Sequence, residues 1–401
     1  MTLPDMRVSL FSGGDDPNYA VPLAESLARQ GIEVEFIGND EMQSASGLES
    51  ASIKYFNLRG GQNPEASAPA KIARIARYYK NLIAYAWRTD SSLFHILWLN
   101  KFEHVDRTLL NLFYKLRRKK LVFTAHNVNS RKRDGTDTWA NRATLRAMYS
   151  MLDHIFVHTE SAKEELILEY GVVPDRITVI PFGLNTYAPE TPVSKRAARS
   201  RLGCDDSATV LLFFGQIAPY KGLDVLLEAF GLAAREDQNL RLVIAGKAKR
   251  GFEAYWREVK SSLERHPMRS SIVVNDDFIP DSDVAVLFKA ADALILPYRA
   301  IYQSGPLSLA FRFGVPVIAT RVGSFNTDVI PGVTGFLCEP SDPRDLAHAI
   351  CQYAQSGLHL EPERARQRIR HIASEKYSWE GISRIMAEVY TRLDKRGALA
   401  C

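Results

Sequence analysis

The chain has 401 residues, 46% of them hydrophobic and 24% charged, and a formal net charge of +5. This length exceeds one ordinary core and the composition is globular, so we expect two domains and exclude a disordered or fibrous chain. No apolar run approaches the ~20 residues of a membrane span. The first residues do not resemble a signal peptide, and the four cysteines show no metal or disulfide spacing, which fits a reducing cytoplasm.

The first half of the chain alternates short apolar runs with helical patterns such as YAVPLAESLARQG and SAKEELILEYG. Strands that alternate with helices form parallel sheets through right-handed crossovers. Runs that are apolar on both faces belong to a sheet that is covered on both sides. The predicted strands are 8–11, 34–38, 95–99, 121–125, 154–158 and 177–181.

A polar stretch with two prolines, residues 183–205, interrupts this alternation and predicts a linker. The alternation then restarts, and the final SWEGISRIMAEVYTRLDKR predicts one amphipathic helix with Trp379 near its start. We therefore predict an α/β fold of two Rossmann-like domains, residues 1–188 and 189–375, followed by a helix over 376–401. The predicted strands of the second domain are 209–215, 240–246, 271–276, 293–298, 315–320 and 334–340.

Ligands of parallel α/β sheets bind beyond the carboxyl ends of the strands, so the loops there are candidate sites. In FFGQIAPYKGLDVLLEAF, Gly215 leaves a predicted strand and Lys221 opens the next helix. A glycine lets the backbone approach a ligand, and a lysine at a helix N-terminus adds charge to the helix dipole. This pattern indicates a phosphate site, with a plain helix-capping turn as the alternative.

The stretch YQSGPLSLAFRFGVPVIAT, residues 302–320, predicts a second anion site. Ser304 is the expected N-cap of a helix whose first turn contains Gly305 and a proline. The amides of Gly305, Leu307 and the following residue would then be free to bind an anion without a charged side chain. Arg299, just before the stretch, could add a cation. A plain strand–helix turn is the alternative.

The loop SGGDDPN follows the first predicted strand. Gly13 and Gly14 suggest that backbone approaches a ligand there, although the spacing is not that of a dinucleotide-binding motif and a simple turn is the alternative. If this loop contacts an acceptor, Asn18 is a candidate ligand. Asp15 and Asp16 are then candidate bases.

A histidine follows another predicted strand, in TAHNVNS. A single histidine is more often structural than functional, but His126 lies at a strand's carboxyl end, which makes it a candidate catalytic group beside Asn127, a candidate acceptor ligand. The triplet from Asp281 to Asp283 is expected to cap a helix rather than to hold a metal. We expect no metal and no other cofactor.

Taken in order, these motifs resemble the GT-B glycosyltransferases, most closely family 4 and its relatives. The resemblance covers nearly the whole chain. It implies two Rossmann-like domains that face a cleft and a last helix that crosses back to the N-terminal domain. The segments that carry it are 179–185, 211–230, 240–246, 290–299, 314–324, 332–350 and the terminal YSWEGI.

The resemblance implies a nucleotide-diphosphate-sugar donor held by the C-terminal domain and a hydroxyl acceptor, a glycan or lipid-linked glycan, held by the N-terminal domain. It also implies transfer without a metal and with retention of the anomeric configuration. Lys221 falls where the family has its diphosphate lysine. Gly246, Phe278 and Ile279 fall where the family surrounds the nucleobase, and His126 where a histidine commonly contacts the donor sugar.

Two features depart from the family pattern. Gln216 stands where the family has an arginine, and Ile301 and Leu309 stand where it has paired glutamates. The chain has no carboxylate at all between Asp292 and Asp328, so retention of configuration is less secure here than in members with the glutamates. The neutral groups that could hold sugar hydroxyls instead are Tyr302, Gln303 and Ser304.

Glycosyl transfer builds negative charge on the leaving diphosphate, which cations and helix amides can stabilise. In a retaining reaction the leaving phosphate helps to deprotonate the acceptor, whereas an inverting one would need Asp15, Asp16 or His126 as a base. An epimerase of the same fold would need catalytic carboxylates, which the C-terminal loops lack. A sugar-nucleotide-binding pseudoenzyme is the second alternative, and turnover of a nucleotide sugar would exclude it.

Residues 66–133 contain 15 Lys+Arg but only 3 Asp+Glu. This excess is either a solvated helix face or the site of an anionic partner, such as membrane head groups, a lipid diphosphate or nucleic acid. No nucleic-acid-binding module is recognisable. Because Lys71, Arg74 and Arg77 recur at helical spacing beside aromatic residues, we predict peripheral docking on the inner face of the cell membrane.

Overall fold

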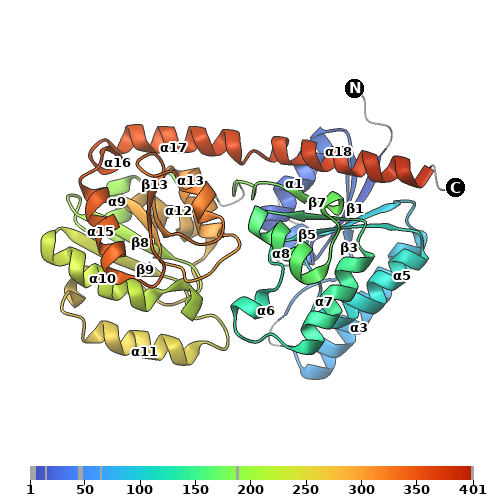
Figure 1. Ribbon diagram of the computed structural model, residues 1–401, viewed down its shortest axis with the longest axis horizontal. Helices are drawn as coiled ribbons and strands as arrows, with labels where there is room; N and C mark the ends of the chain where they lie inside the picture. Colours follow the sequence, from blue (N-terminus) through green and yellow to red (C-terminus); the bar gives the residue numbers. More distant parts are fainter. Residues whose placement is uncertain (1–5, 14–15, 44–47, 64–65, 187–188, 399–401) are drawn as a thin grey trace. The chain divides into compact units, whose positions relative to one another are not determined.

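The computed structural model describes residues 6–13, 16–43, 48–63, 66–186 and 189–398. Its contacts divide the chain into two compact units, shown in Figure 1. The N-terminal unit runs to Gly183 and takes up the chain again at Tyr377, and the C-terminal unit is Leu184–Lys376. The last helix therefore belongs to the N-terminal unit, although almost two hundred residues separate it from the rest of that unit.

In the described part of the N-terminal unit, seven parallel strands form one sheet in the order β3-β2-β1-β4-β5-β6-β7. All of these strands except β3 confirm a predicted run. The sequence analysis misses β3 because IKYFN is an edge strand with only its first residue fully buried, so no apolar run marks it. The strands are β1 (Arg7–Phe11), β2 (Glu33–Gly38), β3 (Ile53–Asn57), β4 (Leu93–Ile96), β5 (Lys120–Ala125), β6 (His154–Val157) and β7 (Ile177–Val179).

Helix α18 (Trp379–Ala398) confirms the predicted C-terminal helix and packs on α1 (Pro17–Arg29). The Ser26 and Ser383 hydroxyls are 2.9 Å apart, and the Tyr390 hydroxyl lies 2.6 Å from His95 Nδ1. The other helical segments of this unit are α2 (Asp40–Gln43), α3 (Ala68–Arg88), α4 (Glu103–Val105), the π-helical η1 (Asp106–Leu110), α5 (Asn111–Leu116), α6 (Ser130–Arg133), α7 (Trp139–Met151), α8 (Glu160–Tyr170) and η2 (Pro174–Arg176).

The described C-terminal unit holds a six-stranded parallel sheet in the order β10-β9-β8-β11-β12-β13, and each strand confirms a predicted run. The strand order reverses between β8 and β11, which is the point at which ligands bind in sheets of this kind. The strands are β8 (Thr209–Phe214), β9 (Leu240–Ala245), β10 (Ile272–Asn275), β11 (Ala293–Leu296), β12 (Val317–Thr320) and β13 (Gly335–Cys338).

The predicted linker is wrong in part, because it contains helix α9 (Lys195–Arg201). Ser194 caps this helix, and Ala198 packs on α12. Arg199 and Lys195 form ion pairs of 2.5 and 2.7 Å with Asp292. The other helical segments of the unit are η3 (Pro219–Lys221), α10 (Leu223–Glu236), α11 (Glu253–Glu264), η4 (Arg269–Ser271), α12 (Asp281–Ala290), α13 (Gly305–Phe313), α14 (Phe325–Asp328), α15 (Pro343–Ala354), α16 (Gly357–Leu360) and α17 (Pro362–Lys376).

Candidate active site

In the C-terminal unit, Lys221 lies against the end of β8 and the start of α13. Gly215 has a φ of +109°, and a Cβ on it would stand 2.9 Å from the Lys221 ammonium and 3.5 Å from Pro306. The lysine is only 7% exposed, and its ammonium lies 5.2 Å from the centre of the Tyr298 ring. The two loops predicted as anion sites therefore meet at one buried cation.

The backbones of the neighbouring loops pack so closely that side chains cannot fit between them. Gly222, at the start of α10, has a φ of +64°, and a Cβ there would lie 2.0 Å from the carbonyl oxygen of Pro297. A Cβ on Gly246, whose φ is +143°, would lie 2.2 Å from the Gly215 carbonyl oxygen. These glycines therefore allow the loops around Lys221 to pack backbone against backbone, and their own amides are used in hydrogen bonds to Pro219 and Asn275.

The N-cap prediction for α13 is confirmed: Ser304 precedes the helix and its side chain accepts from the Leu307 amide. The prediction of three free amides is wrong. Leu307 N lies 3.1 Å from the Ser304 carbonyl oxygen and Ser308 N lies 3.3 Å from it, so the cap uses both donors. Gly305 makes no hydrogen bond of this kind among the described residues, and a Cβ on it would meet open space.

Arg299 is bound within the protein, which argues against its predicted contact with phosphate. Its guanidinium donates to both carboxylate oxygens of Asp224, at 3.0 and 2.5 Å, and to the Pro219 carbonyl oxygen at 2.6 Å. Its backbone amide donates to the Tyr220 carbonyl oxygen at 2.7 Å. Arg299 thus holds the turn that carries Lys221.

The other residues that were predicted to bind the sugar donor differ in how exposed their side chains are. Gln216 presents its side chain to solvent, and Phe278 is 75% exposed whereas Ile279 is buried. Tyr302 and Gln303 are partly buried. At the two positions aligned with the family's glutamates, the side chain of Leu309 is buried and that of Ile301 is partly buried.

In the N-terminal unit, His126 sits in a cage of aromatic rings at the end of β5. Its ring stacks on Trp98 at 4.4 Å between centroids with only 6° between planes, and meets Tyr19 edge-on at 4.6 Å. Its Nε2 is shielded from solvent and has no hydrogen-bond partner within the described ranges. Burial and the nearby imidazoles of His158 and His95 hold the pKa of His126 well below its usual value.

His158, which the sequence analysis does not select, supports His126. Its Nε2 lies 3.2 Å from His126 Nδ1, and its Nδ1 lies 3.3 Å from the Ile180 carbonyl oxygen. Burial lowers the pKa of His158 to about 4. The sequence could have pointed to His158, because it directly follows β6 as His126 follows β5. These strands are neighbours in the sheet, so both histidines lie at the same edge.

The loop after β1 combines a left-handed glycine with a helix cap. Gly13 has a φ of +61°, and a Cβ there would approach Trp98 to 2.8 Å. Asp16 accepts hydrogen bonds from the backbone and side chain of Asn18 as the N-cap of α1, so its carboxylate is already used structurally. Asn127 accepts from Arg133 at 3.3 Å. The predicted residues Gly14 and Asp15 lie outside the described residues.

Within the described ranges, no group of three or more His, Cys, Asp or Glu side chains could hold a metal ion. Asp281 and Asp283 lie in the first turn of α12, whose N-cap is Pro280, so the predicted side-chain cap is not formed.

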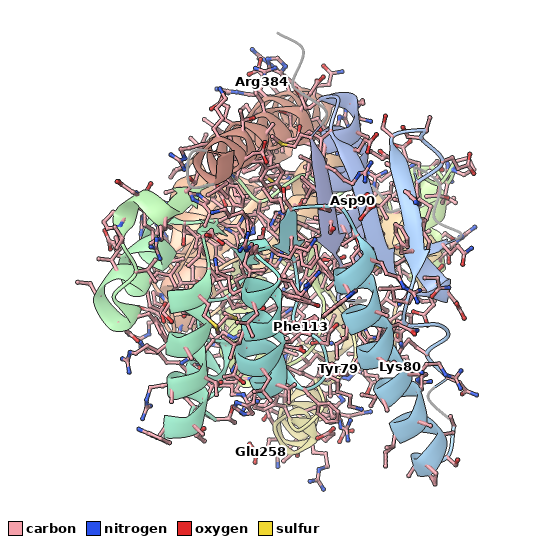
Figure 2. The ribbon with its side chains drawn as sticks, turned by 90° about the vertical axis from the view of Figure 1, so that its right-hand side faces the viewer. Tyr79, Lys80, Asp90, Phe113, Glu258 and Arg384 are labelled. Atoms are coloured by element: carbon pink, nitrogen blue, oxygen red, sulfur yellow. The ribbon has the colours of Figure 1, made fainter. Side chains whose placement is uncertain are left out.

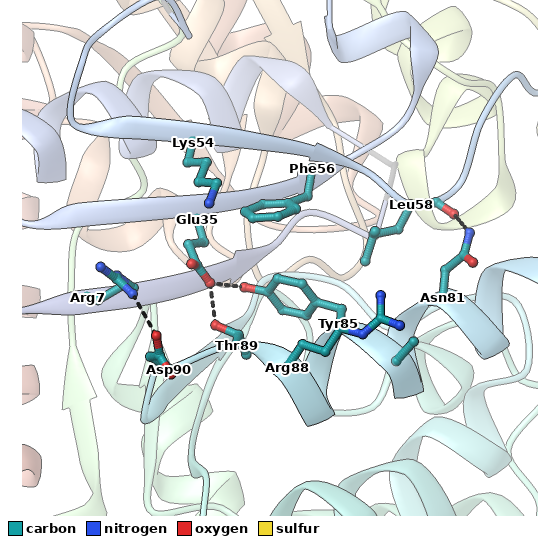
Figure 3. A pocket seen from close by; sticks show the side chains of 11 residues that line it. Arg7, Glu35, Lys54, Phe56, Leu58, Asn81, Tyr85, Arg88, Thr89 and Asp90 are labelled. Atoms are coloured by element: carbon teal, nitrogen blue, oxygen red, sulfur yellow. Dashed lines mark hydrogen bonds and ion pairs between the residues drawn. The ribbon is translucent and has the colours of Figure 1, made fainter.

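A separate cavity of about 390 Å³ opens between α3 and the first strands of the N-terminal sheet (Figure 3). Figure 3 shows the buried Glu35 at its wall, where it accepts hydrogen bonds from Tyr85 and Thr89. None of the predicted site residues lines this cavity. The candidate site is therefore confined to the loops described above.

Two family models match the chain: "Glycosyl transferases group 1" over residues 208–356 and "Glycosyltransferase Family 4" over residues 17–187. The D-inositol 3-phosphate glycosyltransferase of Corynebacterium glutamicum is 26% identical over 93% of this chain and 90% of its own length. The protein of the same name from Geodermatophilus obscurus is 33% identical, over 62% of this chain and 54% of that protein. Several such alignments thus span little more than half of the relative.

Solved structures share the fold. Sucrose-phosphate synthase from Thermosynechococcus elongatus superposes with a TM-score of 0.71 at 21% identity, covering 98% of this chain and 100% of that chain. Anabaena HepE in complex with UDP and glucose gives 0.72 at 17% identity, covering 96% and 100%.

These matches and the two parallel sheets define a glycosyltransferase of the GT-B fold. The chain belongs to the family 4-like glycosyltransferases of group 1.

Proposed function

We propose that this glycosyltransferase moves a sugar from a nucleotide-diphosphate sugar to a hydroxyl of a glycan or lipid-linked glycan. The observation that carries the donor assignment is the buried Lys221 ammonium between Gly215 and the start of α13. A buried cation beside the N-terminus of a helix suits a diphosphate better than a neutral ligand. HepE, whose solved structures contain UDP and UDP-glucose, has the same fold and supports this class of donor.

Charge on the leaving diphosphate is stabilised by Lys221 and the Gly305 amide, and we propose that no metal takes part. Preorganised donors of this kind act strongly in a site from which water is excluded. Arg299 contributes by holding the Pro219–Lys221 turn rather than by touching phosphate, because its guanidinium is paired with Asp224.

The stereochemical proposal is retention. The segment between Asp292 and Asp328 has no carboxylate, and in a retaining reaction the leaving phosphate itself can take the acceptor proton. An inverting reaction would need a base from the N-terminal unit. Asp16 caps α1, and burial holds the pKa of His126 well below its usual value, which makes it a weak base.

Incubation with a panel of nucleotide sugars tests the function. Thermal-shift binding finds the donor, product analysis with lipid and glycan acceptors finds transfer, and the anomeric proton of the product gives the stereochemistry. An epimerised donor without transfer would establish the epimerase alternative, and binding without turnover would establish the pseudoenzyme. An inverted product would overturn retention alone.

We further propose that an anionic bilayer is the partner of α3 and α5. Figure 2 shows these helices side by side, and Arg117 stacks on Trp87 at 4.0 Å to join them. Their exposed large apolar side chains recur at helical spacing: Ile72, Ile83 and Trp87 on α3, then Leu109, Leu112 and Leu116 on η1 and α5. Apolar groups beside cations match an anionic membrane surface.

Each lysine or arginine near an anionic surface contributes ~1 kcal/mol. Among the described helices, none combines the length and apolar composition of a membrane span. We expect the protein to sediment with phosphatidylserine vesicles, to be released by salt, and to bind neutral vesicles weakly.

Trp87→Ser with Leu116→Ser should abolish most of this vesicle binding. Leu168→Ser is the matched control, because Leu168 is 82% exposed on α8, away from α3 and α5. Equal binding to neutral vesicles, or none to either kind, would refute the membrane proposal.

A further inference from the structure

In the hydrogen bond between His158 and His126, the donor and the acceptor can be assigned. The Ile180 carbonyl oxygen can only accept, so His158 Nδ1, 3.3 Å away, must carry a proton. A neutral imidazole has a single N–H, which leaves His158 Nε2 as an acceptor. His126 Nδ1, 3.2 Å from that atom, must then donate to it.

Both rings are neutral near pH 7, as this argument requires. Burial lowers the pKa of His158 to about 4, although hydrogen bonds to the carbonyls of Ile180 and Pro181 act in the opposite direction. Burial is also the largest cause of the lowered pKa of His126, and the neighbouring histidines lower it further.

The proton on His126 Nδ1 leaves its Nε2 as a bare acceptor. That atom is the one shielded from solvent and without a partner in the described part of the chain. Buried polar atoms in proteins are almost always paired, so an unpaired acceptor beside a ligand loop calls for a donor on the ligand. His126 as a whole residue is partly exposed, although its Nε2 is shielded.

The aromatic cage prevents other ring orientations. The Trp98 stack fixes the plane of the imidazole, and Tyr19 closes its edge. Within that plane only a half-turn of the ring is available, and it would remove the nitrogen that faces His158.

We infer that His158 is a positioning residue that holds His126 in the tautomer with a bare Nε2, so that this nitrogen accepts a hydrogen bond from a sugar hydroxyl. This inference rests on the proposed function and adds a chemical requirement to it. A donor sugar that presents a carboxylate, a carbonyl or a bare methylene at this point offers Nε2 no proton and is disfavoured.

Nitrogen-15 spectra of the imidazoles in the free, full-length protein test the tautomer without any ligand. In the wild type, His126 should show a protonated Nδ1 and an unprotonated Nε2. His158→Phe should release this preference and give both tautomers. His158→Gln, whose amide can accept from His126 and donate to Ile180, should retain it.

His154→Phe is the matched control, because His154 begins β6, the strand that His158 follows, lies 2.9 Å from Thr178 and does not pair with His126. Thermal melting and UDP binding of every variant show whether the fold and the C-terminal unit are intact. A wild-type His126 protonated at Nε2, or an unchanged tautomer in folded His158→Phe, would overturn the inference.

Donor analogues that lack one hydroxyl each give the second readout, with UDP-hexoses as probes. We expect one deoxy analogue to lose about tenfold in kcat/KM with the wild type, and His158→Phe to reduce that discrimination while His158→Gln keeps it. Equal use of all analogues by the wild type would refute the hydroxyl requirement. The nitrogen-15 spectra do not depend on sugar transfer. A wrong tautomer assignment and a wrong proposed function can therefore be told apart.

Discussion

Arg299 and Asp224 form a bidentate ion pair, in which two guanidinium nitrogens lie 3.0 and 2.5 Å from the two carboxylate oxygens. The pair joins the segment after β11 to the first turn of α10, which follows Lys221 in the chain. If Arg299 acts by holding this turn, Arg299→Ala and Asp224→Ala should both weaken binding of a nucleoside diphosphate, measured by calorimetry with UDP. If Arg299 bound phosphate directly, Asp224→Ala would free the cation and strengthen binding.

Two further variants sharpen this comparison. Tyr255→Phe removes another donor to Asp224 but leaves the ion pair between Arg299 and Asp224 in place, so it should leave UDP affinity nearly unchanged. Gln216→Arg in the Arg299→Ala background adds a cation at an exposed position of the same loop but does not restore the turn, so it should recover little of the affinity. Recovery of most of the affinity would mean that Arg299 supplies charge to the phosphate.

The same ion pair predicts a pH dependence. Burial raises the pKa of Asp224, but hydrogen bonds from Arg299 and Tyr255 outweigh it and hold the pKa below its usual 3.8. A lowered carboxyl pKa means that the stabilisation is present above the ordinary value and is lost as pH falls through the lowered one. The wild type should therefore lose this component below pH ~4, whereas Asp224→Asn lacks it at every pH, so the difference in stability between the two should shrink in acid. Acid profiles of identical shape would contradict this.

Lys221→Ala should lower kcat by roughly 10²–10³, because it removes a preorganised cation from the leaving diphosphate. Lys260→Ala is the control: Lys260 is a half-exposed lysine of the same unit that pairs with Asp276 on the surface. Steady-state kinetics with the donor found in the panel provide the measurement. Near wild-type turnover of folded Lys221→Ala would remove this lysine from the mechanism.

Transfer should continue unchanged after treatment with a chelator, and added Mg²⁺ or Mn²⁺ should not increase it. Asp281→Asn with Asp283→Asn should have no effect either, because both carboxylates lie in the first turn of α12. Loss of activity in chelator and its return with a divalent ion would show that metal-free transfer is wrong.

Gly222→Ala should destabilise the C-terminal unit by more than the ~1 kcal/mol that a left-handed backbone alone costs a side chain. Its φ is +64° and its new Cβ would press on the Pro297 carbonyl oxygen. Gly203→Ala separates the two effects, since Gly203 has a φ of +66° and open space around it. Equal loss of free energy of unfolding in both variants would mean that the contact with Pro297 is unimportant.

The sequence predicts most of the sheets because the central strands are rich in buried apolar residues. It fails where packing is one-sided: β3 is an edge strand, and α9 buries only Ala198 and Arg199, so neither shows an apolar period. Local features of the site, such as the Ser304 cap, were predictable because cap residues act on amides three positions away.

Contacts between distant residues were not predictable. Arg299 and Asp224 are 75 positions apart, and either could have faced solvent or a ligand on the sequence alone. His126 and His158 are separated by 32 positions and meet only because β5 and β6 are neighbours in the sheet. The roles of charged and titratable groups depend on such partners, which periodicity does not reveal.

Trp379 has a consequence for the order in which the protein folds during synthesis. Its ring lies where a Cβ on Gly183 would come within 2.2 Å, and α18 beyond it supplies Tyr390, which is fully buried beside His95. The N-terminal unit thus lacks part of its own core until the last helix leaves the ribosome, after the whole C-terminal unit has been made. Its first 183 residues must wait with an uncovered face of α1, a state in which domains are prone to aggregate.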